Sequence, residues 1–211
     1  MTKFSAVNLT LAGAICMSFV GLLIRLIESA DGFQILFYRS IGMSLVIITL
    51  ICLRRNKSPF RVLKSLDRND FFMGICFSLA FLTYVFSMLN TSIASTLFLL
   101  SMSPIFAGCI GWFWINEKPH KVVWISMLIA VIGISIMIND GLADSKSFGN
   151  ILAIFSAIFF ALGLVQARKS KKTDVLGGTF LGALFSCFLG LVVTVLLLSL
   201  IHISEPTRLN P

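Results

Sequence analysis

Charged residues are scarce in this sequence. Asp, Glu, Lys and Arg together make up 12% of its 211 residues, whereas hydrophobic residues make up 57%. Ordinary soluble domains carry about 25% charged residues. Because one water-soluble core cannot bury so much apolar surface, the composition excludes an ordinary soluble domain.

Residues that could form a catalytic or metal site are also few. The sequence has two histidines, His120 in a connection and His202 near its end, and no Asp or Glu falls in the middle of a long apolar run. No catalytic dyad or metal cluster can be assembled from such residues, and there is no P-loop for ATP-driven pumping. We therefore expect no enzyme, no metal site and no cofactor.

The cysteines form no pattern typical of a disulfide framework or a zinc site. Each lies inside an apolar run, without the paired spacing of zinc ligands. Thiols in apolar surroundings behave as small hydrophobic groups. The five are Cys16, Cys52, Cys76, Cys109 and Cys187.

Long apolar runs are abundant. An α-helix needs about 20 residues to cross the hydrocarbon core of a bilayer. Seven runs approach this length, at residues 7–27, 33–53, 71–89, 93–115, 122–138, 151–167 and from 176 into the C-terminal region. The first is longer than the apolar part of a signal peptide, and no A-x-A cleavage site follows it. We predict an all-α integral membrane protein, a polytopic bundle of about seven transmembrane helices.

Positive charge alternates among the connections between these runs. Lys and Arg precede the first run at Lys3 and then gather at 54–68, 118–121 and 168–172, whereas the other connections are acidic or neutral. The positive-inside rule therefore predicts a cytoplasmic N-terminus. Although the net charge is +8, the basic residues form no continuous face, so we expect no nucleic-acid partner.

Small residues recur one turn apart in the last two runs, where they let helix backbones approach closely in lipid. The two ridges consist of Ala153, Ala157 and Ala161, and of Gly178, Gly182, Ser186 and Gly190.

A weak internal repeat is also present. Sliding the chain along itself so that Asn8 falls on Asn150 also sets Gly21 on Gly163. Because the first run starts inside and the sixth starts outside, the two copies would be inverted in the membrane, as in many secondary transporters.

Arg39 is the main candidate for a functional charge inside a run. It lies about two turns into the second run from its predicted outer end. A charge at the bilayer centre costs about 2.5 to 3.5 kcal/mol on insertion scales, which makes such a residue a functional candidate. The alternative is an arginine that snorkels to the outer headgroups or pairs with Glu28 or Asp31.

Pro104 interrupts the fourth run just after Ser101 and Ser103. Proline removes a helix hydrogen bond and usually kinks the helix, and the freed carbonyls and serine hydroxyls can then face a polar cavity. A kink that serves packing only is the alternative. Tyr38 and Tyr84 fit either an interfacial aromatic belt or a substrate cage, whereas for Trp112, Trp114 and Trp124 we favour the belt.

The stretch 89–138 carries the most specific pattern. It contains Leu-Asn-Thr-Ser-Ile-Ala-Ser-Thr-Leu, Met-Ser-Pro-Ile-Phe, Trp-Ile-Asn-Glu-Lys-Pro and Ile-Ala-Val-Ile-Gly-Ile-Ser-Ile-Met-Ile. This pattern closely resembles the EamA domain of the drug/metabolite transporter superfamily. Phe37-Tyr38-Arg39 looks like that family's arginine-bearing second helix, and Gly149 onward looks like the start of its second copy.

The resemblance implies a ten-helix inner-membrane transporter built from two inverted five-helix repeats, with both termini cytoplasmic and a central cavity for metabolite export or exchange. On this plan residues 1–140 are the first repeat and residues 148–197 are two helices of the second. Pro104 and Glu117 match the proline and the loop glutamate of the family motif. The glutamate would have a structural role at the cytoplasmic ends of helices four and five.

The sequence departs from the family at its end. Residues 198–211 read like the translation of a transposase adapter used in sequencing libraries, so we expect a non-native tail after Leu197. Because both repeats are needed to wall a cavity between them, we expect no transport by the 211-residue chain alone.

We therefore predict a secondary transporter of a small metabolite that works by alternating access, without a cofactor and driven by an ion or a counter-substrate. Arg39 would anchor an anionic group, with Tyr38, Tyr84, Ser101 and Ser103 in the cavity. Its partners would be the metabolite and the lipid bilayer; a homo-oligomer is left open. The alternative is a non-transporting membrane scaffold or lipid-carrier translocation subunit.

Cysteine labelling tests the predicted orientation. In a background without native cysteines, Lys57→Cys and Lys171→Cys should react with a membrane-impermeant thiol reagent only after the inner face is opened, because both lie in basic connections. Asp144→Cys should react from outside. Labelling of position 57 in intact cells would overturn the orientation.

Overall fold

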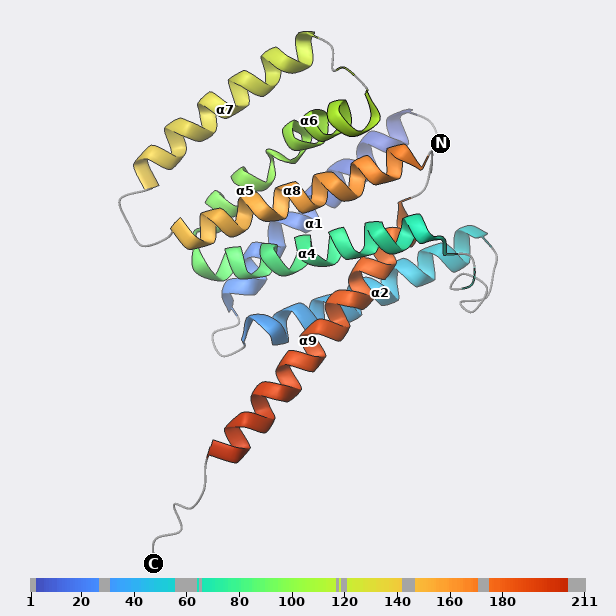
Figure 1. Cartoon of the computed structure of the whole chain (residues 1–211), viewed down its shortest axis with the longest axis vertical. Coiled ribbons are helices and arrows are strands. Elements are labelled where there is room, and N and C mark those ends of the chain that lie inside the picture. The colour runs from blue at the N-terminus through green and yellow to red at the C-terminus, as the bar shows by residue number, and fades with distance from the viewer. Residues whose placement is uncertain are drawn as a thin grey trace, which may run out of the picture. The chain divides into compact units, whose positions relative to one another are not determined.

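The computed structural model describes residues 3–26, 31–55, 64, 66–116, 118, 121–141, 147–170 and 175–204, and this part of the chain is almost entirely helical. Each predicted run coincides with a helix, except that the fourth run is split into two helices (Figure 1). The helices are α1 Lys3–Leu26, α2 Gly32–Arg55, α4 Arg68–Asn90, α5 Ile93–Leu100, α6 Ser103–Ile115, α7 Lys121–Gly141, α8 Ser147–Lys169 and α9 Leu176–Ser204.

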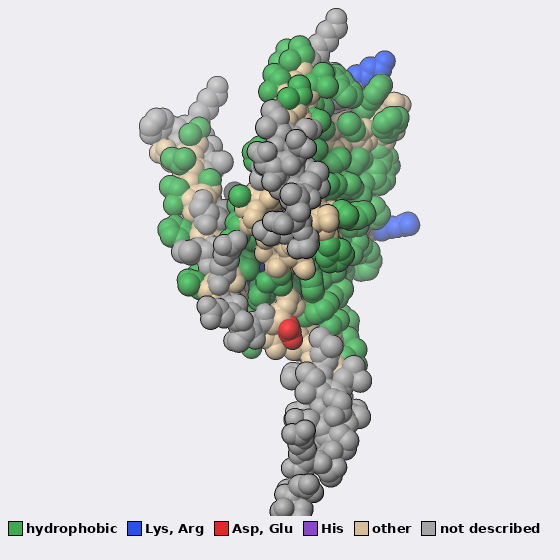
Figure 2. Space-filling view, turned by 90° about the vertical axis from the view of Figure 1, so that its left-hand side faces the viewer, with side chains coloured by type: hydrophobic (Ala, Val, Ile, Leu, Met, Phe, Trp, Pro, Cys, Tyr) green, Lys and Arg blue, Asp and Glu red, His purple; other side chains and the backbone are tan. Residues whose placement is uncertain are grey.

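The described helices have the length and surface of membrane spans. Five segments are long and apolar enough to cross a bilayer: Gly32–Leu53, Arg68–Asn90, Ile93–Ile115, Ser147–Lys169 and Leu176–Leu196. Figure 2 shows hydrophobic side chains over most of the described surface on one face, with few charged side chains among them. Exposed apolar surface of this extent indicates contact with lipid. The predicted fold class, a polytopic helical membrane protein, is confirmed.

The chain divides into two units, Met1–Asp31 and Gly32–Pro211. The first unit contains α1, in which an apolar stripe at a spacing of four residues is more than half exposed: Val7, Leu11, Ile15, Phe19 and Leu23. Residues four apart lie on one face of a helix. α1 therefore has an apolar face suited to lipid or to another helix. All other helices belong to the second unit.

Helix α4 is the central helix of the second unit, and it packs most extensively against α8 and α9. The start of α8 lies at the end of α4, because the Ser87 hydroxyl donates to the Gly149 carbonyl at 2.8 Å. The other end of the pair is joined by the Gln166 amide, which donates to Asn69 at 3.1 Å. α4 and α8 are thus antiparallel.

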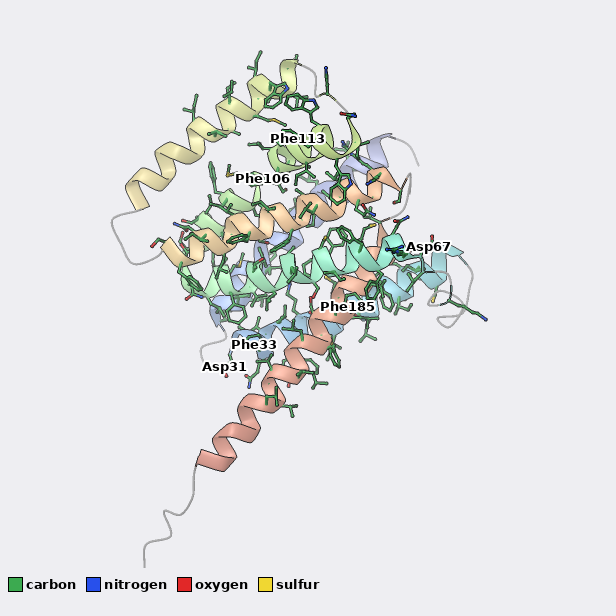
Figure 3. The ribbon with its side chains drawn as sticks, in the orientation of Figure 1. Asp31, Phe33, Asp67, Phe106, Phe113 and Phe185 are labelled. Atoms are coloured by element: carbon green, nitrogen blue, oxygen red, sulfur yellow. The ribbon has the colours of Figure 1, made fainter. Side chains whose placement is uncertain are left out.

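Helix α9 runs parallel to α4 and antiparallel to α2. Gly178 packs against Met73 early in both α9 and α4, and Ser186 bonds to Ser78 further along both helices. Against α2, in contrast, Gly190 late in α9 meets the early residue Phe37. Figure 3 shows Phe185 of α9 beside α4, where its ring lies 5.2 Å from that of Phe71.

These helix directions agree with the alternation that the charges predict. If the seven spans cross the membrane in turn, α4 and α9 must point the same way, and α2 and α8 must point the opposite way. The contacts described above require the same directions. They say nothing about which end is cytoplasmic, which stays a prediction.

Both small-residue ridges serve close helix packing. Ala153, Ala157 and Ala161 of α8 are fully buried. On α9, a methyl-sized group built on Gly178 or Gly182 would lie 2.6 or 2.7 Å from a side chain of α4. No larger residue fits at these separations, so the packing interpretation is confirmed.

Polar side chains reinforce the α4–α8 contact along its whole length. Near one end, the Thr91 hydroxyl donates to Asn150 at 2.8 Å. At mid-helix the buried Ser156 hydroxyl donates to the Ala80 carbonyl at 2.9 Å. Interhelical hydrogen bonds of this kind contribute about 0.6 to 2 kcal/mol each in membranes. They hold α4 and α8 together as one structural element.

Gly163→Ala should destabilise the protein. A Cβ atom at position 163 would lie 2.6 Å from the ring of Phe77. Phe77 is 2% exposed, so neighbouring groups enclose its ring. We expect a loss of about 1 to 3 kcal/mol, the usual cost of overpacking, seen as a lower unfolding temperature when a thiol-reactive fluorogenic dye reports exposure of Cys76 in a background without the other four cysteines.

Gly133→Ala on α7 is the matched control. A Cβ atom there meets nothing within 4 Å, so this change should be neutral or stabilising by up to about 1 kcal/mol because alanine favours helix. Equal destabilisation by both substitutions would contradict the packing argument.

Candidate functional site

Arg39 lies on α2, two turns after the helix begins at Gly32, and rests on two aromatic rings of α4. Its guanidinium carbon is 5.0 Å from the centre of the Tyr84 ring and 5.3 Å from the centre of the Phe81 ring. Phe81 and Tyr84 are three residues apart, so they share one face of α4. Cation–π contacts of this geometry contribute about 0.5 to 2 kcal/mol, the larger value when water is excluded. We call these three residues the Arg39 cluster.

Within the described part of the chain, Arg39 makes no hydrogen bond and no ion pair. Of the two acids named above as alternative partners of Arg39, Glu28 lies outside the described residues and Asp31 belongs to the other unit. A guanidinium has five N–H donors, and aromatic faces satisfy none of them. The cluster therefore holds the cation in place, and its N–H donors have no hydrogen-bond partner among the described residues.

The two tyrosines have different surroundings. Tyr84 is 8% exposed, whereas Tyr38 is 72% exposed and lies against the ring of Phe37 with centres 5.4 Å apart. The structure brings Tyr84 to Arg39 and leaves Tyr38 on the surface, although Tyr38 is the neighbour of Arg39 in sequence. Successive residues point about 100° apart around a helix, which separates them.

The predicted break in the fourth run is confirmed. α5 ends at Leu100, Ser101 and Met102 form a turn, and Pro104 lies in the first turn of α6. The Ile105 N–H donates to the Met102 carbonyl at 2.9 Å, and no backbone N–H of the described residues reaches the Leu100 or Ser101 carbonyl. These two carbonyl oxygens need a polar partner at membrane depth.

The serines at the break do not line one common site. The Ser101 hydroxyl is exposed and donates to the Phe98 carbonyl at 2.6 Å. Ser103 and Pro104 instead line a groove between α6, α7 and α8. Neither serine contacts the Arg39 cluster, so the cavity predicted around Arg39 lacks direct support at these positions.

Described residues line at least two grooves. The larger, which we call the α6–α8 groove, has a volume of about 600 Å³ and includes two cations, Lys118 and Arg168. The smaller, of about 360 Å³, lies between α4 and α9 and is almost wholly apolar. Neither groove is lined by Arg39 or Tyr84.

Aromatic rings and a lysine meet near the end of α6. The rings of Trp112 and Trp124 lie 5.8 Å apart, and the Lys169 ammonium lies 4.8 Å from the centre of the Trp114 ring. Tryptophans beside basic residues at a helix end are typical of an interfacial belt, in agreement with the preferred interpretation. Glu117, the other motif residue besides Pro104, lies outside the described residues.

Reasoning from the sequence missed Phe81 and the polar contacts between α4 and α8. Phe81 has no polar atom to single it out, although its spacing from Tyr84 places both rings on one helix face. Ser87 and Ser156 were detectable as hydroxyls inside apolar runs, because such groups often bond across membrane helices.

Comparison with known proteins identifies relatives. The sequence model of the EamA-like transporter family matches residues 4–139. Human solute carrier family 35 member G1 is 25% identical over 205 residues, which are 91% of this chain and 54% of the human protein. The chain thus spans about half the length of this curated relative. No solved structure matches.

A double-mutant cycle tests the Arg39 cluster. Arg39→Met and Tyr84→Leu should each destabilise the protein, with a coupling energy of about 0.5 to 2 kcal/mol, because each removes the same cation–π contact. Denaturant unfolding of the purified protein in detergent measures it. The control cycle pairs Arg39→Met with Tyr38→Leu, which should be additive. Equal coupling in both cycles would show that the contact with Tyr84 is not specific.

Proposed function

Because this chain belongs to the EamA-like transporter family, within the drug/metabolite transporter superfamily, we propose that its protein is a secondary transporter of a small metabolite. The relative's name describes a solute carrier. We further propose that transport proceeds by alternating access, powered by an ion or a counter-substrate, in the inner membrane with the N-terminus cytoplasmic.

The position and surroundings of Arg39 support the part of this proposal that concerns the substrate. A charge two turns inside a membrane helix is costly unless it is paired or faces water, yet Arg39 has no acidic partner among the described residues. A carboxylate or phosphate group of the substrate would supply that partner through paired hydrogen bonds. The substrate would therefore carry an anionic group.

The Arg39 cluster would position this charge before substrate arrives. The rings of Phe81 and Tyr84 belong to α4, which is fixed by its packing against α8 and α9. A side chain that is already oriented loses less conformational entropy on binding. Tyr84 also carries a hydroxyl group that can donate to the same anion.

The break between α5 and α6 would be the point where the bundle changes shape. Broken helices with free carbonyls occur at the substrate sites of many transporters, and helix ends absorb the backbone rotation of such motions. Only the Ser101–Met102 turn joins the two half-helices. We propose that α6 tilts relative to α5 as access alternates.

The proposed inverted repeat has support from helix directions. Residues 1–140 would be the first repeat and residues 148–197 part of the second, which makes α2 and α9 equivalent helices. Inverted copies must place equivalent helices in opposite directions. The antiparallel contact of Gly190 with Phe37 has that direction.

Substitution of Arg39 tests the function. In the complete gene product, Arg39→Ala should weaken binding of an anionic substrate by roughly 30-fold, since a hydrogen bond to a charged group contributes about 2 kcal/mol. Arg39→Lys keeps the charge but loses the paired geometry, so its substrate affinity should lie between those of the parent protein and Arg39→Ala. Uptake or efflux and ligand-induced thermal shift, screened over anionic, neutral and cationic metabolites, measure the effect.

Arg68→Lys is the matched control, because Arg68 is exposed at the start of α4 and should leave transport unchanged. Transport by Arg39→Ala at the parent rate, with normal membrane insertion, would favour a snorkelling arginine. If no metabolite shifts the unfolding temperature and a fixed partner copurifies instead, the protein is a membrane scaffold.

A further inference from the structure

The α6–α8 groove has the features of a lipid site, and the proposed transport cycle does not use it. Its walls are apolar or small, and include Leu164 and Val165 of α8 and Met127 of α7. No acidic residue is among the described residues that line it. One end is basic, where Lys118 and Arg168 form part of the lining.

Small residues of α6 leave this space open. Gly108 and Gly111 line the groove, and a Cβ atom at Gly111 would meet nothing within 4 Å. At Gly163, by contrast, such an atom would lie 2.6 Å from Phe77. The glycines of α8 and α9 permit helix packing, whereas Gly111 borders a space that no described side chain fills.

The basic end of the groove carries an excess of positive charge even when the neighbouring sequence is counted. The segments 116–122 and 166–175 hold two acidic residues, Glu117 and Asp174. Their basic residues are Lys118, Lys121, Arg168, Lys169, Lys171 and Lys172. Six cations against two anions in the sequence around this end still favour an anionic occupant. Basic pockets between membrane helices on the cytoplasmic side bind anionic lipid headgroups.

The length of the groove matches one leaflet of a bilayer. From Pro104 to the end of α6 at Ile115, the helix rises about 16 Å, and half of the hydrocarbon core is about 15 Å thick. At the C-terminal end of α6, Asn116 adopts φ 60°, a left-handed cap that ends the helix before Lys118. Trp114 with Lys169 marks the headgroup level at the same end.

We propose that the α6–α8 groove binds an anionic phospholipid of the cytoplasmic leaflet. Its phosphate lies at Lys118 and Arg168, and one acyl chain runs along Gly111 and Gly108 toward Ser103. Charge complementarity selects the headgroup, and the apolar walls accept the chain. A soluble phosphate compound would leave these walls facing water, which is why we assign the groove to a lipid.

Tryptophan quenching by brominated lipid tests this proposal. The chain has three tryptophans, Trp112, Trp114 and Trp124, which lie on α6 and α7 beside the groove. The purified protein is reconstituted in phosphatidylcholine vesicles that contain a rising fraction of phosphatidylglycerol brominated near the headgroup end of one chain. Brominated phosphatidylcholine is the reference lipid. We expect phosphatidylglycerol to be preferred roughly tenfold.

Two pairs of variants separate the groove from general surface charge. Lys118→Gln with Arg168→Gln should reduce the preference to nearly none, whereas Lys64→Gln with Arg68→Gln removes two exposed basic residues that do not line the groove and should keep it. Gly111→Leu should weaken quenching by both lipids, because it fills the chain path. Gly133→Leu adds a side chain in open space on α7, so it should not weaken quenching by either lipid.

Several outcomes would overturn the assignment. They are equal affinity of the parent protein for the two lipids, loss of preference in the Lys64 and Arg68 variant as well, or displacement of the brominated lipid by soluble glycerol phosphate. Conversion of a dimer to a monomer by Gly111→Leu, with lipid preference unchanged, would assign the groove to a second copy of the chain. If the double variant fails to fold, Lys118→Gln alone decides, because Lys118 is exposed.

Discussion

The close packing of α4 against α8 and α9 is the interaction on which the rest of the described bundle depends. Lipid is as apolar as the side chains, so helices do not associate by hydrophobic burial and need close contact and shared hydrogen bonds instead. Gly163 and Gly182 let both partner helices approach the buried side chain of Phe77, and Ser156 donates to the α4 backbone. This contact fixes the orientation of α4, and therefore the positions of the rings that support Arg39.

The two charged sites use opposite sides of this packed core. The Arg39 cluster lies between α2 and α4, inside the span of the helices, where an uncompensated charge is costly and a substrate anion would be bound strongly. Lys118 and Arg168 lie at the ends of α6 and α8, where lipid headgroups are within reach. Depth in the membrane thus separates a proposed substrate site from a proposed lipid site.

Helix α7 and the α5–α6 break add freedom to an otherwise firmly packed bundle. Among the described side chains of α7, Met127 is the one that is buried, so this wall of the groove is held by few contacts. The break leaves two carbonyl oxygens without backbone donors among the described residues. Both features lie next to the groove, and a lipid seated there would stabilise one arrangement of α6 and α7 over others.

The sequence by itself determined the class of protein, the position of each helix, the relative directions of α2, α4, α8 and α9, and the break before Pro104. These follow from local chemistry, because backbone groups in lipid must bond within the helix and proline cannot donate. The sequence also singled out Arg39, because a charged residue inside an apolar run can be recognised without a structure. Only the tertiary structure decided that Phe81 and Tyr84 support Arg39 while Tyr38 faces outward, and that Ser103 belongs to a different groove. Those outcomes depend on which faces of separate helices meet, and that is set by the fit of small and large side chains across helices distant in sequence.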